Sequence, residues 1–174
     1  MIVTKAIKPA RFRSEAFTRA ITAAADDAAK GILADFKATT RTWKHEVKFV
    51  KEVDVRASPV QVLVGTDDPI YRYVDEGTKP HPIFAGIYTG KSKAKALSFQ
   101  WAGKGSYTPK TKPGVIGSRA GGPSGPFVAV PYVMHPGTDA REFDITIQKS
   151  WEPRFRRLME QALIVGARGS GHGA

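Results

Sequence analysis

The spacing of apolar residues alternates between a helical period and a strand period, which limits the folds open to this chain. Over residues 14–40 apolar side chains recur every three or four positions and fall on one helix face: Phe17, Ile21, Ala24, Ala28, Ile32 and Phe36. From residue 45 the spacing becomes two, which is typical of strands with one buried face. A helical period returns over residues 141–165. We therefore expect two long helices that bracket a set of strands.

Between these helices the sequence predicts short strands and connecting segments. Strands are expected over four segments, residues 45–56, 60–66, 96–101 and 127–134. The last of them reads as an edge or bulged strand because Pro131 has no N–H to donate to a ladder. Residues 70–78 are expected to form a short element ending in a turn, and residues 79–93 a loop.

The order of these elements predicts an α+β protein. We expect one antiparallel β-sheet packed on one face by an N-terminal and a C-terminal helix, within a single domain over residues 1–174. Residues 102–126 hold seven glycines and four prolines, which predicts an extended loop or arm. The glycine-rich residues 166–174 predict a flexible tail. Pro153 is expected to kink the second helix or to start another one.

Positive charge is concentrated in the middle of the chain. The net charge is +11, and residues 77–138 contain eight basic side chains and no acidic one. A block of this kind suits a polyanion or an acidic protein surface, and it is equally typical of a solvated loop. No apolar run is long enough to cross a membrane. The chain has no cysteine, which excludes disulfides and thiolate metal sites.

Motifs for catalysis are weak or missing, so we expect neither an enzyme nor a cofactor. The sequence has no Gly-x-Ser-x-Gly elbow, and its Gly90-Lys91-Ser92 stretch lacks the earlier glycine of a phosphate-binding loop. A metal site is conceivable from histidines and carboxylates, namely His81, His135, Asp75, Glu76 and Asp139. Both histidines adjoin proline, so loop histidines bonded to backbone are the simpler interpretation. Asp67-Asp68-Pro69 is typical of a turn.

Nucleic-acid binding is the main alternative from another functional class. The arm contains Tyr107, and Phe99 and Trp101 lie at its base, so basic groups stand near aromatic rings. Phe99 and Trp101 also share one strand parity, which a core face explains equally well. No helix-turn-helix, zinc-finger or RNA-recognition motif is present. These features favour weak, sequence-independent contact over specific readout.

Two stretches of the chain, taken together, carry a family resemblance. Residues 71–83 read Tyr-Arg-Tyr-Val-Asp-Glu-Gly-Thr-Lys-Pro-His-Pro-Ile, and residues 133–143 read Val-Met-His-Pro-Gly-Thr-Asp-Ala-Arg-Glu-Phe. With the Leu97-Ser98-Phe99 strand between them, they resemble the tail-completion or head–tail joining proteins of long-tailed phages. That family is typified by the gene-ten neck protein of a lambdoid phage. The chain departs from the family in its arm over residues 102–126, in its extended tail and in Asp75.

The resemblance implies a structural virion protein of the phage neck, made in the host cytoplasm and without catalytic activity. It implies a homo-oligomer, a hexameric ring, that contacts adjacent neck and tail proteins: the connector or stopper, the tail terminator or the tail tube. Non-specific contact with DNA in the channel is a further expectation, and tail completion is not separated from tail termination. The candidate interface residues are Tyr71, Tyr73, Glu76, Lys79, His81, Lys104, Tyr107, Lys110, Lys112, Arg119 and His135.

Overall fold

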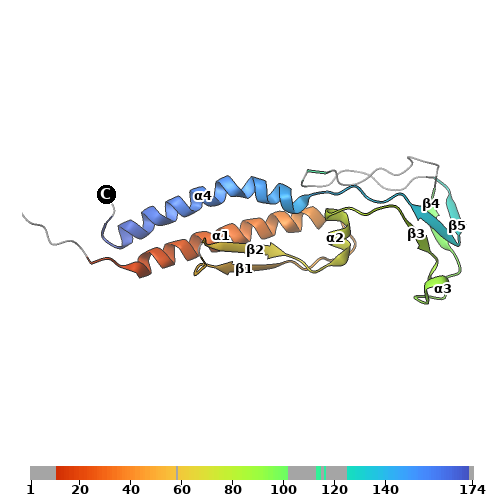
Figure 1. Ribbon diagram of the computed structural model, residues 1–174, viewed down its shortest axis with the longest axis horizontal. Helices are drawn as coiled ribbons and strands as arrows, with labels where there is room; N and C mark the ends of the chain where they lie inside the picture. The colour runs from red at the N-terminus through yellow and green to blue at the C-terminus, as the bar shows by residue number, and fades with distance from the viewer. Residues whose placement is uncertain (1–10, 58, 102–112, 115, 117–124, 173–174) are drawn as a thin grey trace, which may run out of the picture. The chain divides into compact units, whose positions relative to one another are not determined.

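The computed structural model describes residues 11–57, 59–101, 113–114, 116 and 125–172 (Figure 1). It contains helices and antiparallel strands, which confirms the α+β class. The elements in chain order are α1 (Ser14–Thr40), β1 (Val50–Asp54), β2 (Gln61–Gly65), α2 (Pro69–Asp75), β3 (His81–Phe84), α3 (Gly86–Thr89), β4 (Leu97–Gln100), β5 (Phe127–Val130), β6 (Tyr132–His135) and α4 (Phe143–Gly169). Helix α2 occupies most of the expected short element, whereas β3 and α3 lie where a loop was expected.

The strands form separate two-stranded ladders instead of the single expected sheet. Over the described residues, β1 pairs with β2, β3 with β6, and β4 with β5, all antiparallel. Pro131 divides the strand expected over residues 127–134 into β5 and β6, which pair with different partners. Its missing N–H interrupts the ladder, while its carbonyl accepts a bond of 2.9 Å from the Ala85 N–H.

The chain divides into two compact units. Unit 1 comprises Met1–Ala34, Phe49–Gly65 and Gln148–Ala174, and unit 2 comprises Asp35–Lys48 and Thr66–Ile147. Both long helices contribute residues to each unit. The prediction of one domain therefore stays a prediction, and the two units are described separately below.

In unit 1, the N-terminal part of α1 packs closely against the C-terminal part of α4. Small residues are buried in this part of α1, where Ala25, Ala28 and Ala29 have no exposed surface. A side chain at Gly166 would meet the Phe17 ring at 2.7 Å, and one at Gly31 would overlap the Trp151 indole. The glycine at position 31, a weak helix former, is therefore explained by the tryptophan that covers it.

A substitution at Gly31 tests this packing. Glycine to alanine in a helix normally stabilises a protein by about 1 kcal/mol, but here the new methyl group must displace the Trp151 ring, at a cost of about 1–3 kcal/mol. We expect Gly31→Ala to lower the free energy of unfolding in the wild-type chain and to raise it in a Trp151→Ala background. Urea denaturation of wild type, the two single variants and the double variant measures the effect of Gly31→Ala on the free energy of unfolding in each background. A stabilising effect in the wild-type chain would contradict the contact with Trp151.

The β1–β2 ladder belongs to unit 1 and runs along α1 (Figure 1). Directly opposed residues share a face of an antiparallel ladder, so Val53 and Val62 lie on one side together with Lys51 and Val64. Lys51 Nζ bonds Asp26 Oδ1 of α1 at 2.9 Å, which identifies that side as the one facing the helix. The other side is exposed.

Unit 2 has an aromatic core. Tyr71 of α2 lies between Phe36 of α1, Trp43 and Phe143 of α4, with ring centroids 6.0–6.3 Å from its own. Phe143 and Ile147 are almost completely buried. The Tyr71 hydroxyl accepts a long hydrogen bond of 3.5 Å from Thr39 Oγ1. Burial is the main cause that raises the pKa of the Tyr71 phenol above its ordinary value.

Helix α4 bears on two expectations about the C-terminal part of the chain. Pro153 lies inside the helix and does not start a second one, whereas the alternative of a kink stays a prediction. The helix runs to Gly169, and the Ser170 N–H bonds the Gly166 carbonyl at 2.9 Å. The first residues of the expected flexible tail are thus helical, and Gly166 and Gly169 let the last turns pack on Phe17 and Ala16. The flexibility of the tail itself stays a prediction. Residues 173–174 lie outside the described residues.

Candidate interaction surface

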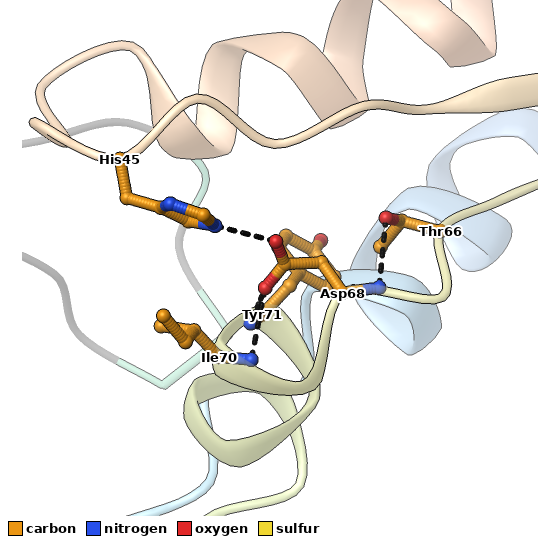
Figure 2. A network of polar contacts seen from close by, with 5 residues as sticks. All are labelled: His45, Thr66, Asp68, Ile70 and Tyr71. Atoms are coloured by element: carbon orange, nitrogen blue, oxygen red, sulfur yellow. Dashed lines mark hydrogen bonds and ion pairs between the residues drawn. The ribbon is translucent and has the colours of Figure 1, made fainter. Parts of the chain in front are cut away.

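Asp68, the residue before helix α2, caps the N-terminus of this helix. Asp68 Oδ1 accepts bonds from the backbone N–H groups of Ile70, at 2.8 Å, and of Tyr71, at 3.0 Å (Figure 2). His45 Nε2 lies 2.5 Å from the other carboxylate oxygen. The hydrogen bond with His45 and those from the backbone lower the pKa of Asp68. The turn expected at Asp67-Asp68-Pro69 is therefore a helix cap, and its carboxylate is already engaged.

Helix α2 and the residue after it carry three of the candidate interface residues. Tyr71 is buried in the core of unit 2, where its ring contacts those of Phe36 and Phe143. Tyr73 is exposed. Glu76 is also exposed and lies 3.8 Å from Arg72, one turn earlier.

Asp75 joins the end of α2 to the start of α4. Its buried carboxylate accepts a hydrogen bond of 2.6 Å from the N–H of Phe143, which is the first residue of α4. Its carbonyl accepts bonds from the N–H groups of Arg141 and Glu142, at 2.9 and 3.1 Å. Burial raises the pKa of the Asp75 carboxyl, and the bond from Phe143 only partly opposes that effect. The residue that departs from the family pattern thus has a structural role.

This pKa shift predicts a pH dependence. Because the folded chain holds the Asp75 proton more tightly than the unfolded chain does, this residue's contribution to stability is lost as pH rises through the folded pKa. We expect Asp75→Asn, which keeps the acceptor, to gain stability relative to wild type as pH rises from about 4 towards neutral. Asp75→Ala should instead lose about 1–3 kcal/mol at every pH, because the Phe143 N–H loses its acceptor. Thermal melts of the three proteins across that pH range would reveal both effects.

The two stretches that carry the family resemblance meet in space. Thr78 and Thr138 form an isolated antiparallel bridge, with N–H to carbonyl distances of 2.9 and 3.0 Å. The preceding glycines have φ of +78° at Gly77 and +90° at Gly137, which only glycine adopts easily. A side chain on either glycine would run into the carbonyl of the opposite threonine. The Gly-Thr pairs therefore form one reciprocal junction that leads into β3 on one side and out of β6 on the other.

His81 and His135 are paired across the β3–β6 ladder. They are register partners, and their rings stack with centroids 5.2 Å apart. His135 Nδ1 accepts a bond of 3.1 Å from the Gly137 N–H, so the proton of the neutral ring is on Nε2. His81 Nδ1 lies 2.8 Å from the Lys79 carbonyl and donates to it. The bonds to backbone were expected, but the two histidines lie in β3 and β6 and not in loops.

The same tautomers bear on the conceivable metal site. A metal bound by both Nε2 atoms needs a lone pair on each of them. In His135 the proton is on Nε2, so this residue could bind a metal there only by moving the proton to Nδ1 and losing the bond from the Gly137 N–H. Over the residues that the structure describes, no group of three or more histidine, aspartate or glutamate side chains is placed to hold a metal ion. The histidine pair is therefore better described as a structural contact across the ladder.

The other side of this ladder is an exposed apolar surface, which we call the β3–β6 outer face. It consists of the register pairs Pro82–Met134 and Phe84–Tyr132. Phe84, Tyr132 and Met134 are 46%, 56% and 58% exposed. The Phe84 and Tyr132 rings lie 6.0 Å apart, so they form one continuous patch.

Exposed lysines occur in the segments before and after α3, close in sequence to this patch. Lys79 precedes β3, and Lys91, Lys93 and Lys95 lie between α3 and β4. Of the remaining candidate interface residues, Tyr73, Glu76, Lys79 and His81 are exposed and His135 is half-buried. Lys104, Tyr107, Lys110, Lys112 and Arg119, together with most of the expected arm, lie outside the described residues.

The sequence analysis missed the apolar residues of this surface. Phe84 fell in an expected loop, and Tyr132 and Met134 fell in a strand whose pairing partner was not identified. An alternating pattern alone does not say which side of a strand is buried. The sequence does contain one signal for these residues, because the apolar run continues past Pro131 through residues 132–134.

Comparison with known proteins gives no match to a family model, a curated protein or a solved structure. In the part of the chain that the structure describes, no helix combines the length and the apolar character needed to cross a bilayer.

Proposed function

We propose that this chain is a structural subunit of a tailed-phage neck, a ring-forming tail-completion or head–tail connector protein that joins tail to head. The proposal combines the resemblance of residues 71–83 and 133–143 with the surface on which those residues lie. By that resemblance the ring is a hexamer in the virion that contacts adjacent neck and tail proteins. The chain acts by affinity and geometry, without catalysis.

The observation that carries the proposal is the exposed β3–β6 outer face. An isolated two-stranded ladder is marginally stable in water unless it packs on something or gains strands. This ladder exposes three large apolar side chains together on one side. Contiguous apolar patches of this kind mark surfaces that bind another protein. A subunit that acts only within an assembly would have such a surface.

Electron microscopy of the purified full-length chain tests the proposal, together with its mass by light scattering. We expect closed rings with a central channel and a mass that is a multiple of the 18.9 kDa chain. A chain that remains a monomer up to the highest concentration reached, with no rings in the images, would refute the proposal. A Tyr132→Ser variant is expected to shift the mass towards the monomer.

A second candidate function is the binding of single-stranded nucleic acid. The Phe84 and Tyr132 rings are exposed side by side, and no acidic residue occurs over residues 77–138. Aromatic rings in a basic surface stack bases and attract phosphates. Titration of labelled oligothymidine distinguishes the two functions. Nucleic-acid binding would be favoured if the logarithm of the binding constant fell linearly with the logarithm of the salt concentration. Tyr132→Ser should then abolish the binding.

A further inference from the structure

A second exposed apolar surface lies on the hairpin of unit 1. The register of β1 and β2 places three pairs on the side away from α1: Val50–Gly65, Glu52–Leu63 and Asp54–Gln61. We call these six residues the β1–β2 outer face. Val50 is 70% exposed and Leu63 is 57% exposed, although both are aliphatic residues of regular strands. Like the β3–β6 outer face, this surface lacks a cover in the described chain.

The two outer faces differ in the sign of their charges. The β1–β2 outer face carries the carboxylates of Glu52 and Asp54 and no basic group. Lys51, the only base within the two strands, is on the opposite side, where it bonds Asp26 at 2.9 Å. The β3–β6 outer face has no charged residue, and every charged residue over residues 77–138 is basic; the exposed ones that the structure describes are Lys79, Lys91, Lys93 and Lys95. An apolar surface with acidic groups thus matches an apolar surface in a basic surrounding.

We propose that the β1–β2 outer face of one copy docks on the β3–β6 outer face of the next copy. The inference rests on the proposed function and specifies the surfaces that join neighbouring subunits. Val50 and Leu63 pack on Phe84, Tyr132 and Met134, and the carboxylates of Glu52 and Asp54 face the lysines of the neighbour. Two different patches meet, so each copy contacts one neighbour through its β1–β2 outer face and another through its β3–β6 outer face. The contact propagates into a ring when the rotation closes.

Charge argues against the symmetric alternative. If two copies joined through the same β3–β6 outer face, two surfaces with basic surroundings would meet, and like charges at an interface oppose association. Joining through two β1–β2 outer faces would bring together four carboxylates from Glu52 and Asp54. Only the heterologous contact places opposite charges together, and it leaves no outer face exposed in a closed ring.

Two variants, alone and mixed, test the inference. The hairpin variant is Val50→Ser with Leu63→Ser, and the ladder variant is Phe84→Ser with Tyr132→Ser. Each keeps one intact outer face, so each is expected to be a monomer alone at concentrations where wild type assembles. In an equimolar mixture, the intact β1–β2 outer face of the ladder variant can bind the intact β3–β6 outer face of the hairpin variant. The mixture should therefore form a heterodimer and no larger assembly. Light scattering and sedimentation velocity measure the three masses.

Matched controls separate loss of contact from loss of folding. Tyr88→Ser and Ile145→Ser remove other exposed apolar side chains and should assemble like wild type. Circular dichroism should show the same helix content in all variants. Glu52→Lys should weaken wild-type association by several-fold at low salt and have less effect at high salt, because exposed charges are screened within about 10 Å at 0.1 M.

The outcomes distinguish this inference from the proposed function. Rings formed by the folded hairpin variant would overturn the inference and leave the proposed function standing. A mixture of folded variants that gives no heterodimer would also overturn it. If the wild-type chain forms no rings at any concentration, the proposed function and the inference are both overturned.

Discussion

Phe143→Ala is expected to lower the free energy of unfolding by about 3–5 kcal/mol, the usual range for truncating a buried aromatic residue. Phe143 has no exposed surface, and its ring lies 6.0 Å from that of Tyr71. It is also the first residue of α4, and its N–H is the donor to Asp75. Domains are stabilised by only about 5–15 kcal/mol, so this single change removes a large part of the total.

Guanidinium denaturation at neutral pH measures the effect of this substitution. The control is Phe143→Leu, which keeps most of the buried volume and should cost less than half as much. The backbone bond to Asp75 is retained in both variants, so the difference between them reports packing alone. A loss below about 1 kcal/mol for the alanine variant would mean that the Tyr71 core does not form as described.

Gly137→Ala is expected to have an effect of similar size, about 2–5 kcal/mol, through the backbone. Alanine at a φ of +90° costs about 1–2 kcal/mol, and its methyl group would also run into the Thr78 carbonyl. The bridge between Thr78 and Thr138 should then open, with loss of β3–β6 pairing. Amide hydrogen exchange at Thr78 and Thr138 follows the bridge, and thermal unfolding follows the whole chain.

Gly90→Ala is the matched control for Gly137→Ala. Gly90 has a φ of +69°, and nothing lies within 4 Å of the position of its missing side chain. Gly90→Ala therefore has the conformational cost of a positive φ without a steric clash of the new methyl group. Equal losses from the two substitutions would show that the packing of Gly137 against Thr78 contributes nothing.

The parts of the fold that follow local periodicity could be predicted from the sequence. Helix α1 has the predicted bounds, because six apolar residues at helical spacing leave few other arrangements. The β1–β2 pair was also predicted, although its strands are shorter than the alternation indicated. Each of these features depends on residues close together in the chain.

Features that depend on distant residues were mostly not predicted. Pairing of β3 with β6 brings residue 81 to residue 135, and periodicity contains no information on which strand pairs with which. Tyr71 was named as a candidate interface residue from the family resemblance, whereas the structure packs its ring on Phe36 and Phe143. Pro153 was expected to kink the second helix or to start another one, and the second alternative is wrong because α4 continues through it. Strand pairing and side-chain burial therefore depend on distant contacts that local patterns do not contain.

The division of the chain into two units has a consequence for how the protein is made. Unit 1 comes from three separate stretches and unit 2 from two, so the chain passes between them four times. No single cut releases an intact unit, and neither can be exchanged with another gene as one segment. On the ribosome, α1 emerges early, but its partner stretch from residue 148 onward is synthesised last. The residues of α1 that contact α4 must therefore wait for almost the whole chain before they are covered.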